Sequence, residues 1–161
     1  MARRIKLMAI ASALVIAFAS PAHAAVIAKN ANGSSISIKK NTFSKPTQIT
    51  VTGLGFDETV GIYLGLCVMP KKSQLPTPCG GGVNKAGVGE SSYWISSNPP
   101  PYGQALAIEY LPGGRFSQQV SISKRIGKFD CTKVKCAITV RADHTREGDR
   151  TRDIFIPITF K

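Results

Sequence analysis

Hydrophobic and polar residues alternate in short runs along most of the chain, and turn residues separate the runs. Within 47–53, Ile49 and Val51 fall on one side of an extended backbone, while threonines fall on the other. Within 153–160, an isoleucine or phenylalanine occurs at every second position from Ile154 onward. A period of two residues is typical of strands with one buried face. The pattern predicts seven antiparallel strands, over residues 34–39, 47–53, 60–67, 91–96, 115–122, 136–142 and 153–160.

The number and spacing of these runs predict the class of fold. Seven short alternating runs within about 130 residues, joined by segments rich in Gly, Pro, Asn and Asp, are typical of an all-β, immunoglobulin-like antiparallel β-sandwich. Pro157 has no amide donor, so we expect the last strand to lie at a sheet edge or to bulge there. Two irregular stretches, 68–90 and 97–114, are long for a compact domain, and loops of that length are usually functional or disordered.

The first 24 residues differ from the rest and predict a secretory signal peptide. Basic residues at positions 3, 4 and 6 precede an apolar stretch, and Ala22 and Ala24 frame an A-x-A cleavage motif. The apolar stretch is shorter than the roughly 20 residues of a membrane span. We therefore expect 1–24 to be removed, which leaves one secreted domain over 25–161 with no stable insertion in a membrane.

The chain carries a formal net charge of +12, with 21 Lys+Arg against 9 Asp+Glu. Three of the basic residues and none of the acidic ones lie in 1–24, so +9 belongs to 25–161. A secreted basic protein could meet teichoic acid, acidic lipid headgroups or nucleic acid, or its charge could serve only solubility. An anionic cell-wall polymer is one candidate partner. Nucleic acid is not expected, because the chain is exported and has no recognisable nucleic-acid motif.

The four cysteines, Cys67, Cys79, Cys131 and Cys136, form an even set in an exported chain, which favours disulfides. Four cysteines allow three connectivities. We favour the two local pairs, 67 with 79 and 131 with 136, because each would close a short loop. Spacers of eleven and four residues match neither a tetracysteine zinc site nor a redox C-x-x-C pair, so no metal and no cofactor is predicted.

Several sequence features together resemble one known family. "VTGLGF" leads into "VGIYLGLC", and "FDCTKVKC" leads into "RADHTREGDRTRDIFIPITF". Over residues 47–160 the chain resembles the neocarzinostatin-like proteins, which are secreted immunoglobulin-like proteins of actinobacteria. Its final segment is most similar to uncharacterised surface proteins of that family. The resemblance implies a cleft between the sandwich and two loops, where the antibiotic carriers of the family hold an enediyne chromophore.

The resemblance also implies which residues would bind a ligand. The disulfide of Cys67 and Cys79 would form the floor of the cleft, and Met69 would lie near a position where the carriers place an aromatic residue. Tyr93 and Trp94 would fall near a second aromatic position. The carriers have a longer, aromatic-bearing hairpin before the D-C-T element, whereas this chain has an additional Pro-rich segment at 97–114. Whether that segment leaves the cleft open or fills it stays open at this stage.

The charged loop at 141–153 contains His144, the only histidine in 25–161. His144 and a neighbouring aspartate could supply part of a catalytic triad, but no nucleophile motif accompanies them, and a single histidine does not favour a metal site. Alternating Asp and Arg residues could instead order the loop through ion pairs and aspartate caps. Trp94 beside Tyr93 and Tyr102 could form an exposed aromatic surface for binding, or it could belong to the core.

These observations lead to several hypotheses about function. The first is a secreted, non-enzymatic binding protein that holds a small apolar ligand or a cell-envelope partner through the loops of its sandwich. The second is an envelope-associated structural or adhesion domain, held to anionic wall polymers by its basic surface. A chromophore carrier with a DNA-directed antibacterial role, and a small hydrolase that uses His144, are lesser alternatives.

Overall fold

The computed structural model describes residues 24–82, 88, 89 and 91–161. Apart from Ala24, the predicted signal peptide lies outside the described residues, so its removal and the start of the domain at residue 25 stay predictions. The strands are β1 Val26–Lys29, β2 Ser35–Ile38, β3 Thr42–Phe43, β4 Thr47–Leu54, β5 Ile62–Val68, β6 Val88–Gly89, β7 Ser92–Ile95, β8 Phe116–Ile122, β9 Arg125–Ile126, β10 Phe129–Asp130, β11 Cys136–Ala142 and β12 Ile154–Phe160. Short 3₁₀ turns are η1 Gly80–Gly82, η2 Pro101–Gly103, η3 His144–Arg146 and η4 Arg150–Arg152.

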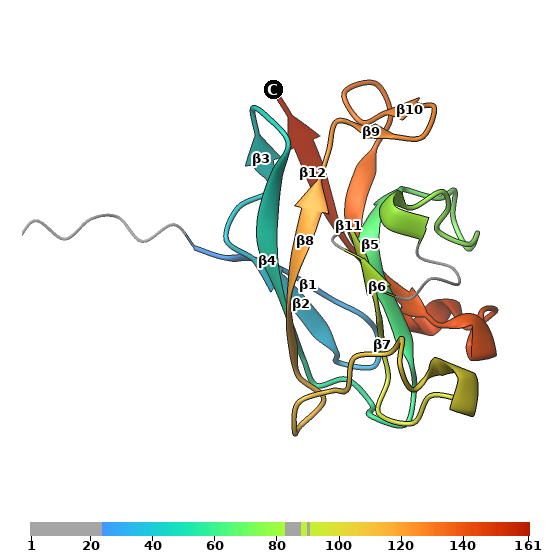
Figure 1. The fold of residues 1–161 in the computed structure, drawn as a ribbon. Helices are drawn as coiled ribbons and strands as arrows, with labels where there is room; N and C mark the ends of the chain where they lie inside the picture. Colours follow the sequence, from blue (N-terminus) through green and yellow to red (C-terminus); the bar gives the residue numbers. More distant parts are fainter. Residues whose placement is uncertain (1–23, 83–87, 90) are drawn as a thin grey trace, which may run out of the picture.

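Two sheets pack face to face, which confirms the predicted β-sandwich (Figure 1). One sheet has the order β1-β2-β4-β8, and the other has the order β3-β12-β11-β5-β7-β6, while β9 and β10 form a separate hairpin. Each of the seven predicted runs overlaps one of the strands β2, β4, β5, β7, β8, β11 and β12. Their pairings with one another are antiparallel, and among the described strands only the short β3 joins its neighbour, β12, in parallel.

The core lies between the two sheets and follows the predicted alternation. Val51 of β4 and Val120 of β8 face Leu64 of β5 and both Ile138 and Val140 of β11, and all five side chains are fully buried. Burying one such aliphatic side chain contributes about 1.5–3 kcal/mol. The period-two pattern therefore places the residues that hold the sandwich together.

The last strand, predicted to lie at a sheet edge or to bulge at Pro157, is the second strand of the six-stranded sheet, and only its part around Pro157 has no described strand on its outer side. On one side β12 pairs with β11, where Pro157 is opposite Ala137. On the other side β3 pairs with β12 only at Thr159 and Phe160. No described strand pairs with Pro157 on that side. The missing N–H of Pro157 therefore leaves no ladder hydrogen bond unmade there.

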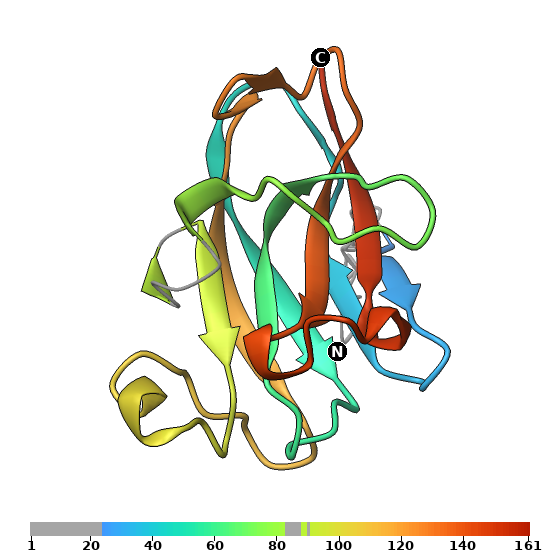
Figure 2. The same cartoon turned by 90° about the vertical axis from the view of Figure 1, so that its right-hand side faces the viewer.

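The six-stranded sheet is buried on its outer face as well. Every residue of β11 is buried, including Thr139 and Arg141, which point away from the core. Figure 2 shows segments 69–79 and 143–153 crossing in front of β5, β11 and β12, with 97–107 beside β7. These three segments, called the covering loops from here on, close the face where the sequence predicted a cleft.

Both local disulfides predicted from the sequence form: Cys67 bonds to Cys79, and Cys131 bonds to Cys136. The first ties the end of β5 to a covering loop, and the second closes the turn between β10 and β11. Within the described ranges, no group of His, Cys, Asp and Glu is arranged to hold a metal ion. A search of the same ranges finds no helix long and apolar enough to cross a membrane.

One end of the core is closed by aromatic rings that depend on a tight backbone contact. Phe56 packs on Phe116 with ring centroids 5.2 Å apart and on Tyr110 with centroids 6.2 Å apart. The amide of Phe56 donates to the carbonyl of Gly114 at 3.0 Å. Gly114 has φ +61°, and a Cβ atom there would collide with the backbone of Phe56.

We predict that Gly114→Ala lowers the free energy of unfolding by about 3 kcal/mol, because the added methyl group collides with backbone that cannot move aside. The matched control is Gly113→Ala. Gly113 has φ +82° with open space around its Cβ direction, so only the backbone penalty of about 1 kcal/mol applies. Urea unfolding of both variants measures the difference. Equal losses of stability for the two would contradict the packing argument.

Candidate functional site

Three aligned residues form the centre of the covered sheet face. The register places Arg141 of β11 opposite Tyr63 of β5, and Tyr63 opposite Trp94 of β7. All three side chains point away from the core, yet each is at most 2 % exposed. Directly opposed residues on one sheet face lie in contact distance, so the covering loops close over a continuous aromatic and cationic row.

Trp94 is sealed by polar contacts from one covering loop and by close packing from another. Its indole Nε1 donates to Asp143 Oδ2 at 2.9 Å, and Asp143 is 2 % exposed. Gly103 lies against the six-membered ring of Trp94, so close that a Cβ atom there would collide with the ring. A Cβ atom at Gly61 would likewise collide with the carboxylate of Asp143. Segment 97–107 therefore fills the space beside Trp94, which answers the question that the sequence left open.

His144 bridges two covering loops by hydrogen bonds to two tyrosines. Its Nδ1 lies 2.5 Å from the hydroxyl of Tyr63, and its Nε2 lies 2.6 Å from the hydroxyl of Tyr102. Burial and the charge of Asp143 raise the pKa of Tyr63 to about 12, so this phenol keeps its proton and can donate it. We assign the ring proton of His144 to Nε2, because in that tautomer Nδ1 accepts from Tyr63 and Nε2 donates to Tyr102.

Arg141 completes the row from the other side. Its guanidinium carbon lies 4.9 Å from the ring centroid of Tyr63, and its Nη1 lies 3.7 Å from Glu147 Oε1. Burial lowers the pKa of Arg141, and the charge of Glu147 opposes that effect. From here on, Tyr63, Trp94, Tyr102, Arg141, Asp143 and His144 are called the aromatic–histidine cluster.

The cluster joins loops and offers no catalytic machinery of the triad type. Both ring nitrogens of His144 are occupied by phenols, so neither is placed to activate a serine or cysteine nucleophile. Both carboxylate oxygens of Asp143 are also occupied, one by Trp94 and the other by the backbone and hydroxyl of Thr145. The chemistry that this arrangement supports is the fixing of loops on the sheet.

The charged loop is ordered by the aspartate caps and ion pairs that its sequence indicated. Asp143 caps η3, and Asp149 caps η4 by accepting from the backbone N–H of Thr151 at 3.0 Å. Hydrogen bonds from Thr151 also hold the pKa of Asp149 below its ordinary value. Arg152 contacts Asp149 at 3.3 Å, and Arg150 contacts Asp153 at 3.0 Å. The loop is thus a rigid part of the cover.

The five residues predicted to bind a ligand do not line one cleft among the described residues. Cys67 and Trp94 are buried under the covering loops, while Met69 and Cys79 are partly exposed. Tyr93 points to the opposite face of the sheet from Trp94, and its hydroxyl donates to the carbonyl of Gln119 on β8 at 2.5 Å. Alternation along a strand forces such a separation of neighbours. A ligand-binding role for these residues stays a prediction.

A hollow of about 330 Å³ remains open between two covering loops, over Phe155 of β12. Met69 and its neighbours line one side, and Arg150 and Asp153 line the other. Asp153 Oδ1 is buried and has no hydrogen-bond partner among the described residues. Burial raises the pKa of Asp153 to about 6, although the charge of Arg150 opposes this shift. We call this space the Met69 hollow.

Charged residues are divided between the two ends of the sandwich. In the described residues every ion pair joins an arginine to an acid, and all four lie at or near segments 55–61 and 141–153. The register places segments 39–47, 122–136 and 160–161 together at the other end, shown with β3, β9, β10 and the C-terminus in Figure 1. We call it the lysine end. Its only acidic residue is Asp130, and its basic residues are Lys39, Lys40, Lys45, Lys124, Arg125, Lys128, Lys133, Lys135 and Lys161.

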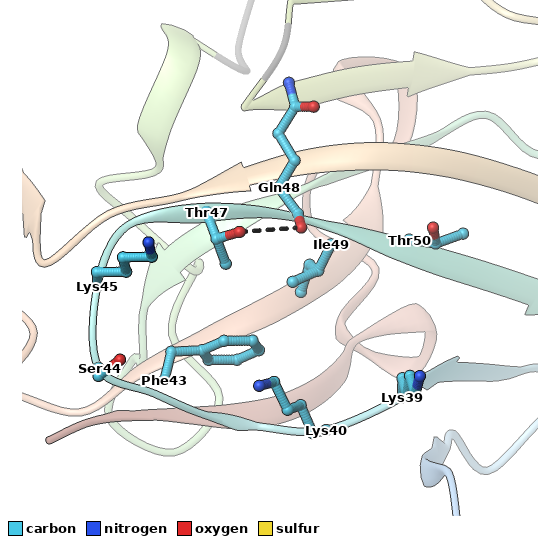
Figure 3. Close-up of a pocket in the computed structure, with 9 residues that line it drawn as sticks. All are labelled: Lys39, Lys40, Phe43, Ser44, Lys45, Thr47, Gln48, Ile49 and Thr50. Atoms are coloured by element: carbon cyan, nitrogen blue, oxygen red, sulfur yellow. Dashed lines mark hydrogen bonds between the residues drawn. The ribbon is translucent and has the colours of Figure 1, made fainter.

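A second hollow, of about 320 Å³, lies at the lysine end between β3 and the start of β4 (Figure 3). Phe43 and Ile49 point into it, and Lys39, Lys40 and Lys45 stand around it. No acidic residue is among its lining side chains. We call it the Phe43 hollow; sequence reasoning did not anticipate it, because β3 is too short to show alternation.

Comparisons with known proteins support the fold and leave the family undetermined. No protein-family model matches the chain, and no curated protein matches its sequence. The solved structure of macromomycin, a member of the neocarzinostatin family, superimposes with a TM-score of 0.50 at 14 % sequence identity. The match covers 80 % of this chain and 100 % of macromomycin. A neocarzinostatin-like fold is therefore suggested, in agreement with the resemblance found in the sequence.

We predict that His144→Ala lowers the free energy of unfolding by about 1–3 kcal/mol, because the buried hydroxyl of Tyr63 loses its acceptor. Tyr102→Phe removes the other bond of the same imidazole at an exposed position, so its cost should stay below about 1 kcal/mol. Chemical denaturation followed by circular dichroism measures both. A larger loss for Tyr102→Phe than for His144→Ala would contradict the assigned roles.

The two aspartates of the charged loop should affect stability with opposite dependence on pH. Asp153 has a raised pKa of about 6 against an ordinary 3.8, so its contribution favours folding at low pH and is lost as pH rises through 6. Asp153→Asn should therefore gain about 2 kcal/mol relative to wild type between pH 4 and 7. Asp149 has a lowered pKa, so its contribution is lost as pH falls below 4. Unfolding at several pH values tests this, and parallel pH profiles for Asp153→Asn and wild type would contradict it.

Proposed function

We propose that the chain is a secreted, non-enzymatic binding protein that attaches to an anionic polymer of the cell envelope through its lysine end. The observation that carries the proposal is the division of charge. Arg141, Arg150 and Arg152 pair with acids at one end, whereas the described lysines make no ion pair. A cluster of uncompensated charges of one sign attracts polyanions and raises their rate of encounter.

The kind of basic residue agrees with this role. Lysine presents a mobile, hydrated ammonium group, which suits a flexible polymer with repeated negative charges better than one fixed partner. The lysine end is built from loops and strand ends of both sheets, so the charge stands on a rigid support. Two disulfides suit an oxidising extracellular compartment, and they keep that support intact there.

The filled face of the six-stranded sheet argues against holding a chromophore or another large apolar ligand beside Trp94. Segment 97–107 and Asp143 occupy that space with the chain's own side chains. Opening it would expose Trp94 and leave the carboxylate of Asp143 without its indole partner, and each of these changes is unfavourable. A chromophore carrier with an action on DNA is therefore the less supported proposal.

A second candidate function is the binding of a small ligand in the Met69 hollow. Arg150 and Asp153, which line this hollow, each have one buried polar atom, Nε and Oδ1 respectively, without a hydrogen-bond partner among the described residues. A ligand that reached both atoms with adjacent donor and acceptor groups would satisfy them at once. Titration of a panel of amides and sugars, followed by the amide resonances of residues 150–155, would test this candidate. The absence of any saturable shift would remove it.

The main proposal predicts that the position of the positive charge matters more than its amount. Reversal of four lysines at the lysine end, Lys40, Lys45, Lys128 and Lys133, to Glu should weaken binding to purified cell walls about tenfold or more at low salt. The matched control reverses Lys29, Lys71, Lys72 and Arg115, which lie outside the lysine end and give the same net charge.

Cosedimentation with cell walls over a range of salt concentrations measures both variants. Binding of the wild type should weaken steeply as salt rises, because exposed charges are screened. The control should stay within about twofold of wild type if the lysine end makes the contact. Equal losses in both variants would mean that net charge alone acts, and salt-independent binding would also overturn the proposal.

A further inference from the structure

The Phe43 hollow has the features of a discrete site inside the lysine end. It lies where the chain leaves the four-stranded sheet after β2, adds β3 to the six-stranded sheet and returns as β4. Phe43 is held there because β3 pairs with β12, which places Phe43 beside Phe160 with ring centroids 6.4 Å apart. The hollow is therefore bounded by strands of both sheets, and its shape is fixed by the fold.

A cation is already positioned at this hollow. Lys40 Nζ lies 5.4 Å from the centroid of the Phe43 ring, within the range of a cation–π interaction. Figure 3 shows Lys40 below the ring and Lys45 on the other side of the hollow, with Lys39 farther along the same segment. No acidic side chain lines the space, so the three positive charges favour an anion as occupant.

The chemistry of the lining selects among anions. An arginine would match the planar fork of a carboxylate, but the hollow contains only lysines, which bind phosphate as point charges. Ser44 and Thr47 add hydroxyl groups, and the Thr47 hydroxyl makes only a long 3.4 Å contact to the carbonyl of Gln48. A tetrahedral phosphate with several acceptor oxygens can use ammonium and hydroxyl donors from different directions.

The apolar part of the lining indicates what the phosphate is attached to. Figure 3 shows Phe43 and Ile49 pointing into the hollow, whereas Gln48 extends from the opposite side of β4. A volume of about 320 Å³ is at the lower end of ligand pockets. Such a space accommodates a short carbon body beside its phosphate group, as in a polyol or sugar phosphate, rather than a long acyl chain.

We infer that the Phe43 hollow is a subsite for the phosphate group of a polyol or sugar phosphoester, with Lys39, Lys40 and Lys45 as its cations and Phe43 beneath the carbon body. The inference rests on the proposed function, because it names the unit of the anionic polymer that the lysine end recognises. Such a unit could come from a wall polymer or from a lipid headgroup, and both present the same chemistry.

The test is a titration of the wild-type secreted protein with glycerol 3-phosphate at constant ionic strength, followed by amide resonances. Glycerol and acetate serve as probes that lack the phosphate. We expect saturable shifts in residues 39–50 with glycerol 3-phosphate, and none with glycerol. Acetate should bind at least about fivefold more weakly. Shifts spread over all lysines without saturation, or equal binding of acetate, would overturn the inference.

Matched variants separate the subsite from general charge. Lys40→Ala with Lys45→Ala should raise the Kd for glycerol 3-phosphate about tenfold, whereas Lys128→Ala with Lys133→Ala should change it less than about twofold. All four lysines are exposed, so both variants should keep the wild-type circular dichroism spectrum. Equal effects of the two pairs would contradict a discrete subsite.

Binding to the polymer distinguishes this inference from the proposed function. If cell walls still sediment the protein but glycerol 3-phosphate causes no saturable shift, the subsite fails and the proposed function stands. If glycerol 3-phosphate binds at 39–50 but cell walls do not retain the protein, the subsite stands and the wall proposal fails. Binding of the protein to vesicles that contain phosphatidylglycerol then tests a lipid headgroup as the source of the phosphate. Displacement of the protein from these vesicles by glycerol 3-phosphate would identify the headgroup as the ligand.

Discussion

The buried hydrogen bond from Trp94 to Asp143 fixes the relation between the sheets and the loops. It joins β7 to the loop between β11 and β12 inside a space that excludes water, where an unpaired indole or carboxylate would be costly. Once Asp143 is held, His144 follows it in the chain and reaches Tyr63 and Tyr102. The outer face of the six-stranded sheet becomes a second, smaller core, and the space beside Trp94 is filled by the protein itself.

This closure changes where recognition can occur. A sandwich that fills its own cleft must bind partners through other surfaces. The positive charge of the lysine end distinguishes one such surface. Arginines serve the covering loops by pairing with acids, because their planar guanidinium group suits fixed ion pairs. Lysines collect at the other end without acidic partners. The same chain thus separates the residues that build structure from those available to a partner, and the Phe43 hollow adds shape to what would otherwise be diffuse charge.

Much of the fold could be predicted from the sequence, because one physical rule governs it: alternation places one side of each strand in the core. That rule located seven strands and the inward residues of β5, β11 and β12, and short spacing located both disulfides. The rule did not predict that the side chains of Tyr63 and Arg141 are buried. Alternation places both on the outer face of the sheet and carries no information about the loops that cover that face. Tyr63 within an apolar run was the available signal. The pairing of His144 with Tyr102 joins segments distant in sequence, and no local pattern contains that information.

The central claim, that the chain's own loops seal the sheet face beside Trp94, is tested most directly by the solvent access of this side chain. Trp94 is the only tryptophan, so acrylamide quenching of its fluorescence reports on one site. The account predicts blue-shifted emission, quenching far weaker than in the unfolded chain, and no saturable response to apolar ligands. Quenching close to that of the unfolded chain, or saturable changes on addition of an apolar ligand, would contradict it.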